Sequence, residues 1–407
     1  MSITMLETVT PEAVGLSSAR LGRVTDLMRR YVDEGKLAGL VGVIWRSGAV
    51  AYAEAVGQRD IEAGTPMTLD TIFRIASMTK PITSVAVMML YEEGRFQLND
   101  PISRYLPELG AMQVMVGGTP EAPLLEPTAR PVTVHDLFTH TGGLAYGLLP
   151  QLSPIEAMYA AARMTAFDEP LAEKIVRLGR LPLASQPGTR WQYSLSTDVL
   201  GRLVEVLSGQ TLDVFFRERI FAPLGMTETG FQVAPSALDR LAALYTLGPT
   251  GLTLVEAPGA SQFARPAVLL SGGGGLVSTP ADYLRFCQML LNEGDLDGVR
   301  LLGRKTVELM TMNHLPAALM PPVIFPAAAQ FTAGQGFGLG VSVQVDMTQA
   351  QIIGSPGAYG WGGAFETVFW NDPAEDLIAM FYTQFAPSMF YPLRREVRVA
   401  VYQAIVE

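Results

Sequence analysis

Hydrophobic and polar positions repeat with two different periods near the start of the chain, and these periods predict a helix followed by a hairpin. In residues 17–35 the apolar positions recur at the spacing of one helix face, namely Leu21, Val24, Leu27, Met28 and Tyr31. Residues 39–45 and 49–56 are rich in β-forming residues and are joined at Arg46-Ser47-Gly48. Two such runs joined by a short glycine-containing turn indicate an antiparallel β-hairpin.

Strand patterns return in the last quarter of the chain. Residues 338–345, 364–370 and 377–382 are predicted strands, with a turn at Asn371-Asp372-Pro373 between the last two. Residues 393–405 then show a helical pattern. The C-terminal part is therefore expected to supply further strands and a closing helix.

Between about residues 77 and 240 the pattern is helical, with connections rich in glycine and proline. We expect the strands of both ends to form one antiparallel sheet flanked by the N- and C-terminal helices, with the helical region inserted between them. The prediction is an α/β fold of two subdomains, because 407 residues is long for one layered domain. The sheet subdomain comprises 1–70 and 241–407, the mainly helical one 71–240, and the active site lies between them.

Composition excludes several classes of protein. Apolar residues make up 49% of the chain and charged residues 17%, which is typical of a globular protein. The net charge of −10, without a basic patch, argues against a nucleic-acid partner. No apolar stretch approaches the roughly 18–20 residues of a membrane span, and the N-terminus lacks a basic signal-peptide region. The lone Cys287 excludes intrachain disulfides, so we expect a cytoplasmic protein of undetermined oligomeric state.

A single Ser-x-x-Lys pair, Ser77 and Lys80, is the strongest chemical signal. Lys80 is one of only four lysines, and chance would give such a pair about 0.2 times in this composition. If Ser77 opens a helix, as Pro81 in the first turn indicates, positions i and i+3 share a face and the amine reaches the hydroxyl. A serine hydroxyl becomes a good nucleophile when a base accepts its proton. The alternative is a helix-capping serine beside a solvated lysine.

Other motifs do not indicate a different chemistry. No serine lies in Gly-x-Ser-x-Gly, and His135 and His140 fall in a short helix capped by Thr133, where structural roles are expected. No cluster of metal-ligand type is present, so neither a metal nor another cofactor is expected. The glycines at 272–275 precede the helix-capping signature of Thr279, Pro280 and Asp282, which indicates a tight turn rather than a phosphate loop.

Four motifs together resemble those of serine β-lactamase-like and penicillin-binding proteins. They are Ser77-Met78-Thr79-Lys80, His140-Thr141-Gly142-Gly143-Leu144, Tyr193-Ser194-Leu195 and Tyr359-Gly360-Trp361-Gly362-Gly363. Their order and spacing cover nearly the whole chain and are most similar to the family VIII carboxylesterases, which look like class C β-lactamases.

The resemblance implies roles for individual residues. Ser77 would be the acylated nucleophile, Lys80 would take or share its proton, and Tyr193 would be general base and then general acid. The backbone N–H groups of Ser77 and Ala364 would form an oxyanion hole. Trp361, Gly362 and Gly363 would contact the substrate, and the glycines would let it lie close to the strand backbone.

Two departures from the class C pattern bear on selectivity. Leu195 stands where those enzymes have the asparagine of Tyr-x-Asn, and Trp361-Gly362-Gly363 replaces their Lys-Thr-Gly. An apolar indole in place of a cation favours neutral esters over anionic substrates. The prediction is a serine carboxylesterase acting on small, short-chain neutral esters. Alternatives are an acyltransferase of the same fold, a weak β-lactamase or D-Ala-D-Ala peptidase-like enzyme, and a catalytically silent binding protein.

Two long segments, 111–130 and 315–336, have apolar content that would suit acyl or aryl groups; the second includes Phe325 and Phe331. Loops of this length are often binding loops. The sequence leaves open whether they line a pocket or form ordinary surface.

Overall fold

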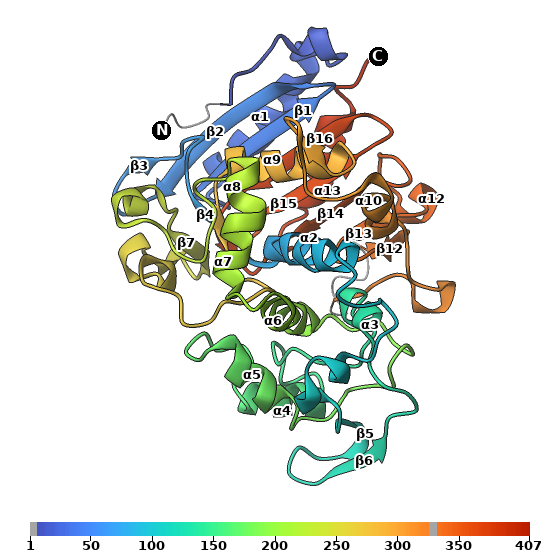
Figure 1. The fold of residues 1–407 in the computed structure, drawn as a ribbon. Helices are drawn as coiled ribbons and strands as arrows, with labels where there is room; N and C mark the ends of the chain where they lie inside the picture. Colours follow the sequence, from blue (N-terminus) through green and yellow to red (C-terminus); the bar gives the residue numbers. More distant parts are fainter. Residues whose placement is uncertain (1–5, 325–331) are drawn as a thin grey trace.

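The computed structural model describes residues 6–324 and 332–407 and is built around an eight-stranded antiparallel sheet (Figure 1). The sheet joins both ends of the chain, since Val41 near the N-terminus pairs with Tyr382 near the C-terminus. This confirms the predicted sheet. In spatial order its strands are β12 Gln335–Phe337, β13 Ser342–Gln344, β14 Tyr359–Gly362, β15 Val368–Asp372, β16 Leu377–Tyr382, β1 Gly39–Arg46, β2 Ala49–Asp60 and β3 Thr65–Pro66.

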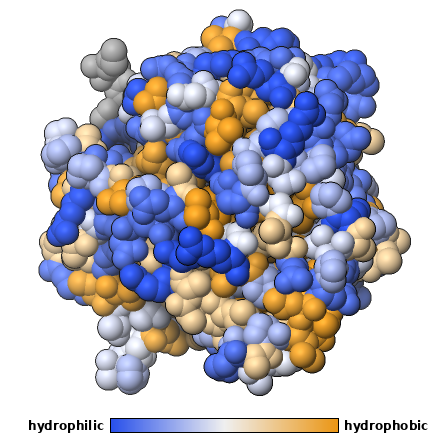
Figure 2. Space-filling model, turned by 60° about the horizontal axis from the view of Figure 1, so that its bottom comes forward, coloured by the Kyte–Doolittle hydropathy of each residue, from blue (hydrophilic) through white to orange (hydrophobic). Residues whose placement is uncertain are grey.

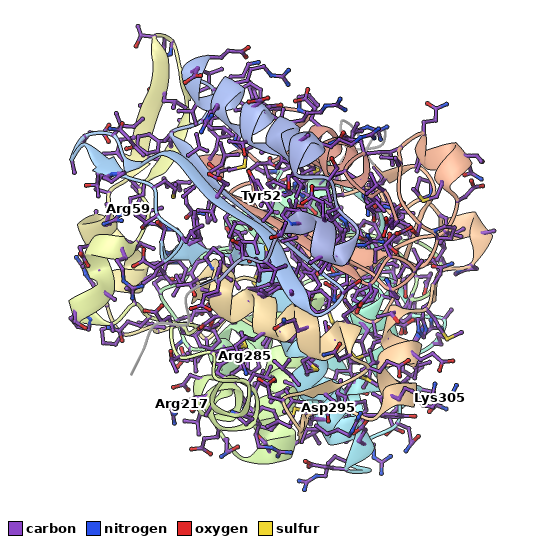
Figure 3. All side chains as sticks on the ribbon, turned by 90° about the horizontal axis from the view of Figure 1, so that it is seen from above. Tyr52, Arg59, Arg217, Arg285, Asp295 and Lys305 are labelled. Atoms are coloured by element: carbon purple, nitrogen blue, oxygen red, sulfur yellow. The ribbon has the colours of Figure 1, made fainter. Side chains whose placement is uncertain are left out.

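Two helices from opposite ends of the chain cover the outer face of the sheet. These are α1 (Ser18–Asp33) and α13 (Leu393–Tyr402), which pack against each other and share one core cluster with β1, β2 and β16. The predicted apolar stripe of α1 is buried, and each such side chain contributes about 1.5–3 kcal/mol. The hydroxyls of Thr25 on α1 and Tyr52 on β2 lie 3.0 Å apart and add a polar contact between helix and sheet. Tyr52 is labelled in Figure 3.

The opposite face of the sheet contacts α9 (Pro280–Leu291), and α2 (Thr79–Glu92) lies between the sheet and α6 (Ser196–Ser208) (Figure 1). Helix α2 is buried from Thr79 to Leu90, which is typical of a helix enclosed on all sides. Further α-helices within residues 6–324 and 332–407 are α3 Val134–Phe138, α4 Pro154–Ala161, α5 Leu171–Leu178, α7 Leu212–Phe216, α8 Ala222–Leu224, α10 Arg304–Thr311 and α12 Met347–Ala350.

Small two- and three-stranded sheets connect these layers. One hairpin, β5 with β6, lies inside the region that was predicted to be helical and projects at the bottom of Figure 1. The members are β4 Phe73–Arg74 with β9 Val277–Ser278, β5 Gln113–Gly118 with β6 Pro123–Pro127, β7 Leu244–Gly248 with β8 Gly251–Glu256 and β17 Phe385–Ala386, and β10 Asp295–Leu296 with β11 Val299–Arg300.

Two predicted strands overlap observed strands, β13 and β15, but their predicted boundaries were wrong. Residues 338–345 are not one strand but a turn followed by β13, because Gly340 has a φ of +94°, which favours glycine, and the Gly338 amide donates to Val341 O. Residues 364–367 form a turn, and the strand before it is β14, so the Trp361 motif is itself in the sheet. In both places the pairing with neighbouring strands, rather than local β-propensity, decided the boundary.

The subdomain limits at 70/71 and 240/241 stay a prediction. Among the described residues no helix is long and apolar enough to cross a membrane.

Candidate active site

Ser77 lies in a sharp turn between β4 and α2. A single 3₁₀ turn, Ala76–Met78, separates them, and Ala76 has a φ of +44°, in the left-handed region that costs a non-glycine residue about 1 kcal/mol or more. The N-cap of α2 is Met78, so Ser77 lies next to the N-cap position rather than at it. Among the described residues its hydroxyl caps no backbone amide, so it remains available as a nucleophile.

The structure brings Ser77, Lys80 and Tyr193 into direct contact. Lys80 Nζ donates to Ser77 Oγ over 3.2 Å, and the Tyr193 hydroxyl donates to the same oxygen over 2.7 Å. Lys80 Nζ also lies 4.6 Å from the centroid of the Tyr193 ring. Lys80 is fully buried. A nucleophile and two groups able to exchange its proton therefore share one hydrogen-bonded cluster.

The glycine run at 272–275 supplies a backbone acceptor for the ammonium of Lys80. Lys80 Nζ donates to Gly273 O over 2.6 Å, while Asp198 Oδ1 accepts from the Gly273 amide over 3.0 Å and from Ser271 Oγ over 2.6 Å. The predicted cap of the following helix is confirmed, since Thr279 accepts from the amide of the third helical residue.

Sequence reasoning did not predict that the glycine run at 272–275 also accepts a hydrogen bond from Lys80, or that Asp198 holds this run in place. A backbone carbonyl has no sequence signature. The signal that the sequence offers is a carboxylate, Asp198, shortly after the Tyr193 motif. Its burial in the first turn of α6 is visible only in the structure.

The segment around His140 supports the loop that carries Tyr193. The Gln192 amide donates to His140 O over 2.9 Å, and His140 Nδ1 lies 3.1 Å from Ser194 Oγ. Burial, together with the charge of Lys80, lowers the pKa of His140 well below its usual 6.5, so its imidazole is neutral. His140 makes no hydrogen bond to Ser77 among the described residues, and it acts on the site by positioning the loop.

Aromatic rings surround Tyr193. Its ring centroid lies 5.5 Å from that of Tyr146, 6.2 Å from Trp191 and 5.7 Å from Trp361. Burial, with smaller contributions from Tyr193 and Asp198, raises the pKa of Tyr146 well above 10, so that phenol stays protonated. These apolar neighbours lower the local dielectric constant and so strengthen electrostatic interactions at the Ser77 hydroxyl.

The end of β14 lies against the turn that carries Ser77. A Cβ at Gly363 would lie 2.6 Å from Ile75 O, and a Cβ at Gly362 would collide with the guanidinium of Arg394. The glycines therefore accommodate protein neighbours. Both also line the cavity that contains Ser77, so the expected contact with a substrate stays a prediction. The Ala364 amide has no hydrogen-bond partner among the described residues, and Ala364 and Ser77 line one cavity. This arrangement is compatible with the predicted oxyanion hole.

Two adjoining cavities meet at Tyr146 and Tyr193. The first, of about 490 Å³, is lined by Ser77 and Trp361 and is mostly apolar. The second, of about 750 Å³, has Leu148 and Leu152 exposed among its lining residues. Figure 2 shows apolar groups interspersed with hydrophilic ones on the side that lies at the bottom of Figure 1.

Both long segments left open by the sequence contribute to the second cavity. The lining residues from them include Met115, Gly117, Gly118, Leu319, Met320 and Ile324. Phe325 and Phe331 lie outside the described residues. The structure therefore favours the interpretation of these segments as parts of a binding site.

A buried carboxylate anchors the helix that precedes His140. Asp136 completes a capping box with Thr133 and accepts from Arg130 Nη1 and Nη2 over 2.6 and 2.8 Å. Burial by itself would raise the pKa of Asp136, but the hydrogen bonds from Arg130 and Thr133 outweigh it and hold the pKa below its usual range. The folded-state pKa thus lies below the unfolded-state value of about 3.9.

Replacing Asp136→Asn should destabilise the protein at neutral pH, because Arg130 loses its anionic partner. The expected loss is about 2 kcal/mol, less than for a fully buried pair, because solvent partly screens Arg130. A lowered folded-state pKa adds stability that is complete above pH about 4 and is lost as the pH falls through the folded value. Urea unfolding at pH 7 and at pH 3 would measure this, and the difference between wild type and variant should shrink in acid. Asp168→Asn, at an exposed pair with Arg163, is the control and should change little. An equal loss at both pH values would contradict the linkage.

Comparison with known proteins places the chain among related sequences and folds. The family described as Beta-lactamase matches residues 24–403. Protein Rv1367c of Mycobacterium tuberculosis (strain ATCC 25618 / H37Rv) is 38% identical over 365 residues, which are 89% of each chain. Esterase EstB of Burkholderia gladioli is 31% identical over 420 residues, covering 96% of this chain and 98% of EstB.

Among solved structures, EstCE1, described as a hydrolase with promiscuous acyltransferase activity, matches with a TM-score of 0.80 at 26% identity. The match covers 96% of this chain and 99% of EstCE1. The predicted β-lactamase-like fold is thereby confirmed.

Proposed function

The chain belongs to the Beta-lactamase family, and on that premise we propose that it is a serine carboxylesterase that hydrolyses short-chain neutral esters through an acyl-enzyme on Ser77. The observation that carries this proposal is the hydrogen-bonded set of Ser77, Lys80 and Tyr193 at the wall of a largely apolar cavity. The similarity to Esterase EstB over nearly the full length of both chains supports it. Membership of family VIII and a cytoplasmic location belong to the same proposal.

The contacts support a two-step mechanism. In the reactive state the pair of Tyr193 and Lys80 has released one proton, so that Tyr193 accepts the proton of Ser77 Oγ as this oxygen attacks the ester carbonyl carbon. The negative charge moves to the carbonyl oxygen, which the amides of Ser77 and Ala364 would stabilise. Collapse of this intermediate breaks the bond to the alcohol, which leaves with the proton from Tyr193. A water molecule then gives a proton to Tyr193 and attacks the acyl carbon. The bond from this carbon to Ser77 Oγ breaks, and Tyr193 returns the proton to Oγ as the acid leaves.

The lining residues favour neutral substrates. Leu195 is 2% exposed and lines the cavity beside Trp361, so neither position offers an amide or an ammonium to an anionic substrate. Arg394 also lines this cavity, but Glu366 Oε1 accepts from its Nε over 2.7 Å and compensates its charge.

A series of p-nitrophenyl esters tests the proposal. We expect kcat/KM to be highest between acetate and hexanoate and to fall at least about tenfold for dodecanoate, because a fixed cavity rejects chains it cannot hold. Nitrocefin and benzylpenicillin should be turned over at least about 100-fold less efficiently than the best ester, since the groups that hold a β-lactam's amide and carboxylate are missing. β-Lactam turnover comparable with ester turnover would overturn the assignment.

Acyl transfer is the second candidate, because EstCE1 is described as having that activity and the two-part cleft offers space for an acyl group and an alcohol. Adding an alcohol to the ester assay and separating the products distinguishes the two functions. A transferase would form mainly the new ester, whereas the proposed hydrolase forms mainly the acid. Labelling of Ser77 by a fluorophosphonate separates both from a silent binding protein.

A further inference from the structure

A second buried lysine lines the cavity that contains Ser77. Lys174 lies on α5, whose buried positions are Leu171, Lys174, Ile175 and Leu178. Positions i, i+3, i+4 and i+7 form one face of a helix, so Lys174 occupies a site where an apolar residue would complete the core stripe. The residue is only 2% exposed. A buried ammonium is costly unless its hydrogen bonds are satisfied, so a lysine at this position calls for a ligand or a partner.

The protein itself satisfies only part of the hydrogen-bonding capacity of the Lys174 ammonium. Lys174 Nζ donates to Ala166 O over 2.6 Å, and among the described residues it has no carboxylate within 4.0 Å. An ammonium carries three N–H donors, so two remain beyond the bond to Ala166 O, on a side chain that lines the cavity. Burial lowers the pKa of Lys174, and the carboxylate of Asp198 opposes that shift.

The surroundings favour a neutral oxygen as the missing acceptor. Much of the nearby wall is apolar, and Lys174 Nζ lies 5.7 Å from the centroid of the Phe167 ring. The carboxylates of Asp198, Glu169 and Asp168 already favour the charged form of Lys174. A neutral acceptor would satisfy its remaining donors without burying a further charge. Two arginines that line the same cavity, Arg74 and Arg394, are paired with Glu256 and Glu366. A keto, hydroxyl or second ester oxygen accepts a hydrogen bond without adding charge.

We propose that Lys174 determines specificity by donating a hydrogen bond to a neutral oxygen on the part of the ester that enters this cavity. The preferred substrates are then oxygen-bearing esters, such as oxo- or hydroxyacyl esters or diesters, rather than plain alkyl esters. This inference rests on the proposed hydrolysis at Ser77 and names its substrate class.

Matched pairs of esters test the inference. One series compares p-nitrophenyl alkanoates of four to eight carbons with oxoalkanoates of the same length, moving the ketone along the chain. A second compares alkyl acetates with oxoalkyl acetates, so that the alcohol side is also examined. In wild type we expect about a tenfold higher kcat/KM for the ketone at one position in one series, the gain typical of a hydrogen bond from a charged donor.

The substitution Lys174→Met keeps the length of the side chain and removes the donor. It should bring the ratio of ketone to alkyl kcat/KM to about one, and this ratio is a readout that a merely structural role would not move. Lys305→Met is the matched control, because Lys305 lies on the outer surface with its side chain 72% exposed (Figure 3), and it should leave the ratio unchanged.

A second measurement separates this inference from the proposed function. Calorimetry with the Ser77→Ala protein compares binding of an intact ketone ester with that of its alkyl counterpart, which requires no turnover. Absence of all ester hydrolysis in wild type would refute the proposed function, while the binding ratio would still report on Lys174. No ketone preference at any position, or a preference that survives Lys174→Met, would overturn the inference. A stronger Lys174-dependent preference for a chain ending in a carboxylate would overturn the neutral assignment.

Discussion

Ser77→Ala should lower kcat/KM for p-nitrophenyl butyrate at least about 10⁴-fold while the protein stays folded, because the hydroxyl that would carry the acyl group is gone. Lys80→Ala should have a loss of similar size, since Lys80 Nζ contacts the same oxygen. It should also cost about 1–3 kcal/mol of stability, because the buried Gly273 carbonyl loses its donor. Nucleophile and base act as a unit, so the double variant should be little worse than either single one.

The chain offers a matched control on the same helix. Ser84 is fully buried on α2, and its hydroxyl has no hydrogen-bond partner among the described residues. Ser84→Ala should therefore keep near-wild-type kcat/KM. The measurements are steady-state kinetics, urea unfolding, and mass spectrometry of the fluorophosphonate adduct. A Ser77→Ala protein that hydrolyses esters at near the wild-type rate, or an adduct on another residue, would remove Ser77 from the nucleophile role.

Tyr193→Phe should lower kcat about 10³-fold with little change in KM. The substitution removes the hydroxyl that lies 2.7 Å from Ser77 Oγ but keeps the ring among its aromatic neighbours. General acid–base groups typically contribute about 10²–10⁴-fold to rate.

Tyr146→Phe is the control for this experiment, because Tyr146 stacks on Tyr193 yet its hydroxyl makes no hydrogen bond to Ser77 among the described residues. Its effect on kcat should stay below about tenfold. If Tyr193→Phe retains near-wild-type kcat, the proton-transfer role belongs to Lys80 alone.

Local sequence determined the features that depend on residues within one or two turns of each other. The stripe from Leu21 to Tyr31 specifies α1 because residues three and four apart share a helix face. The spacing of Ser77 and Lys80 likewise placed an amine near a hydroxyl before any fold was known, and the structure gives their separation as 3.2 Å. Tyr193 lies 116 residues away, and only the order of the motifs, through a family resemblance, linked it to Ser77.

Tertiary structure alone decided the rest. Three contacts join segments that are distant in sequence. Lys80 Nζ donates to Gly273 O, Asp198 accepts from the Gly273 amide, and Lys174 lines the cavity that contains Ser77. Every residue has a backbone carbonyl, so the sequence does not single out Gly273. A lysine in an amphipathic helix is normally expected to be exposed to solvent. Their roles arise because packing of the helical region against the sheet buries them at one place, and burial makes an unsatisfied polar group costly. The periodicity of α5 places Lys174 on the same face as Leu171 and Ile175, but only the tertiary packing makes this face border the cavity that contains Ser77.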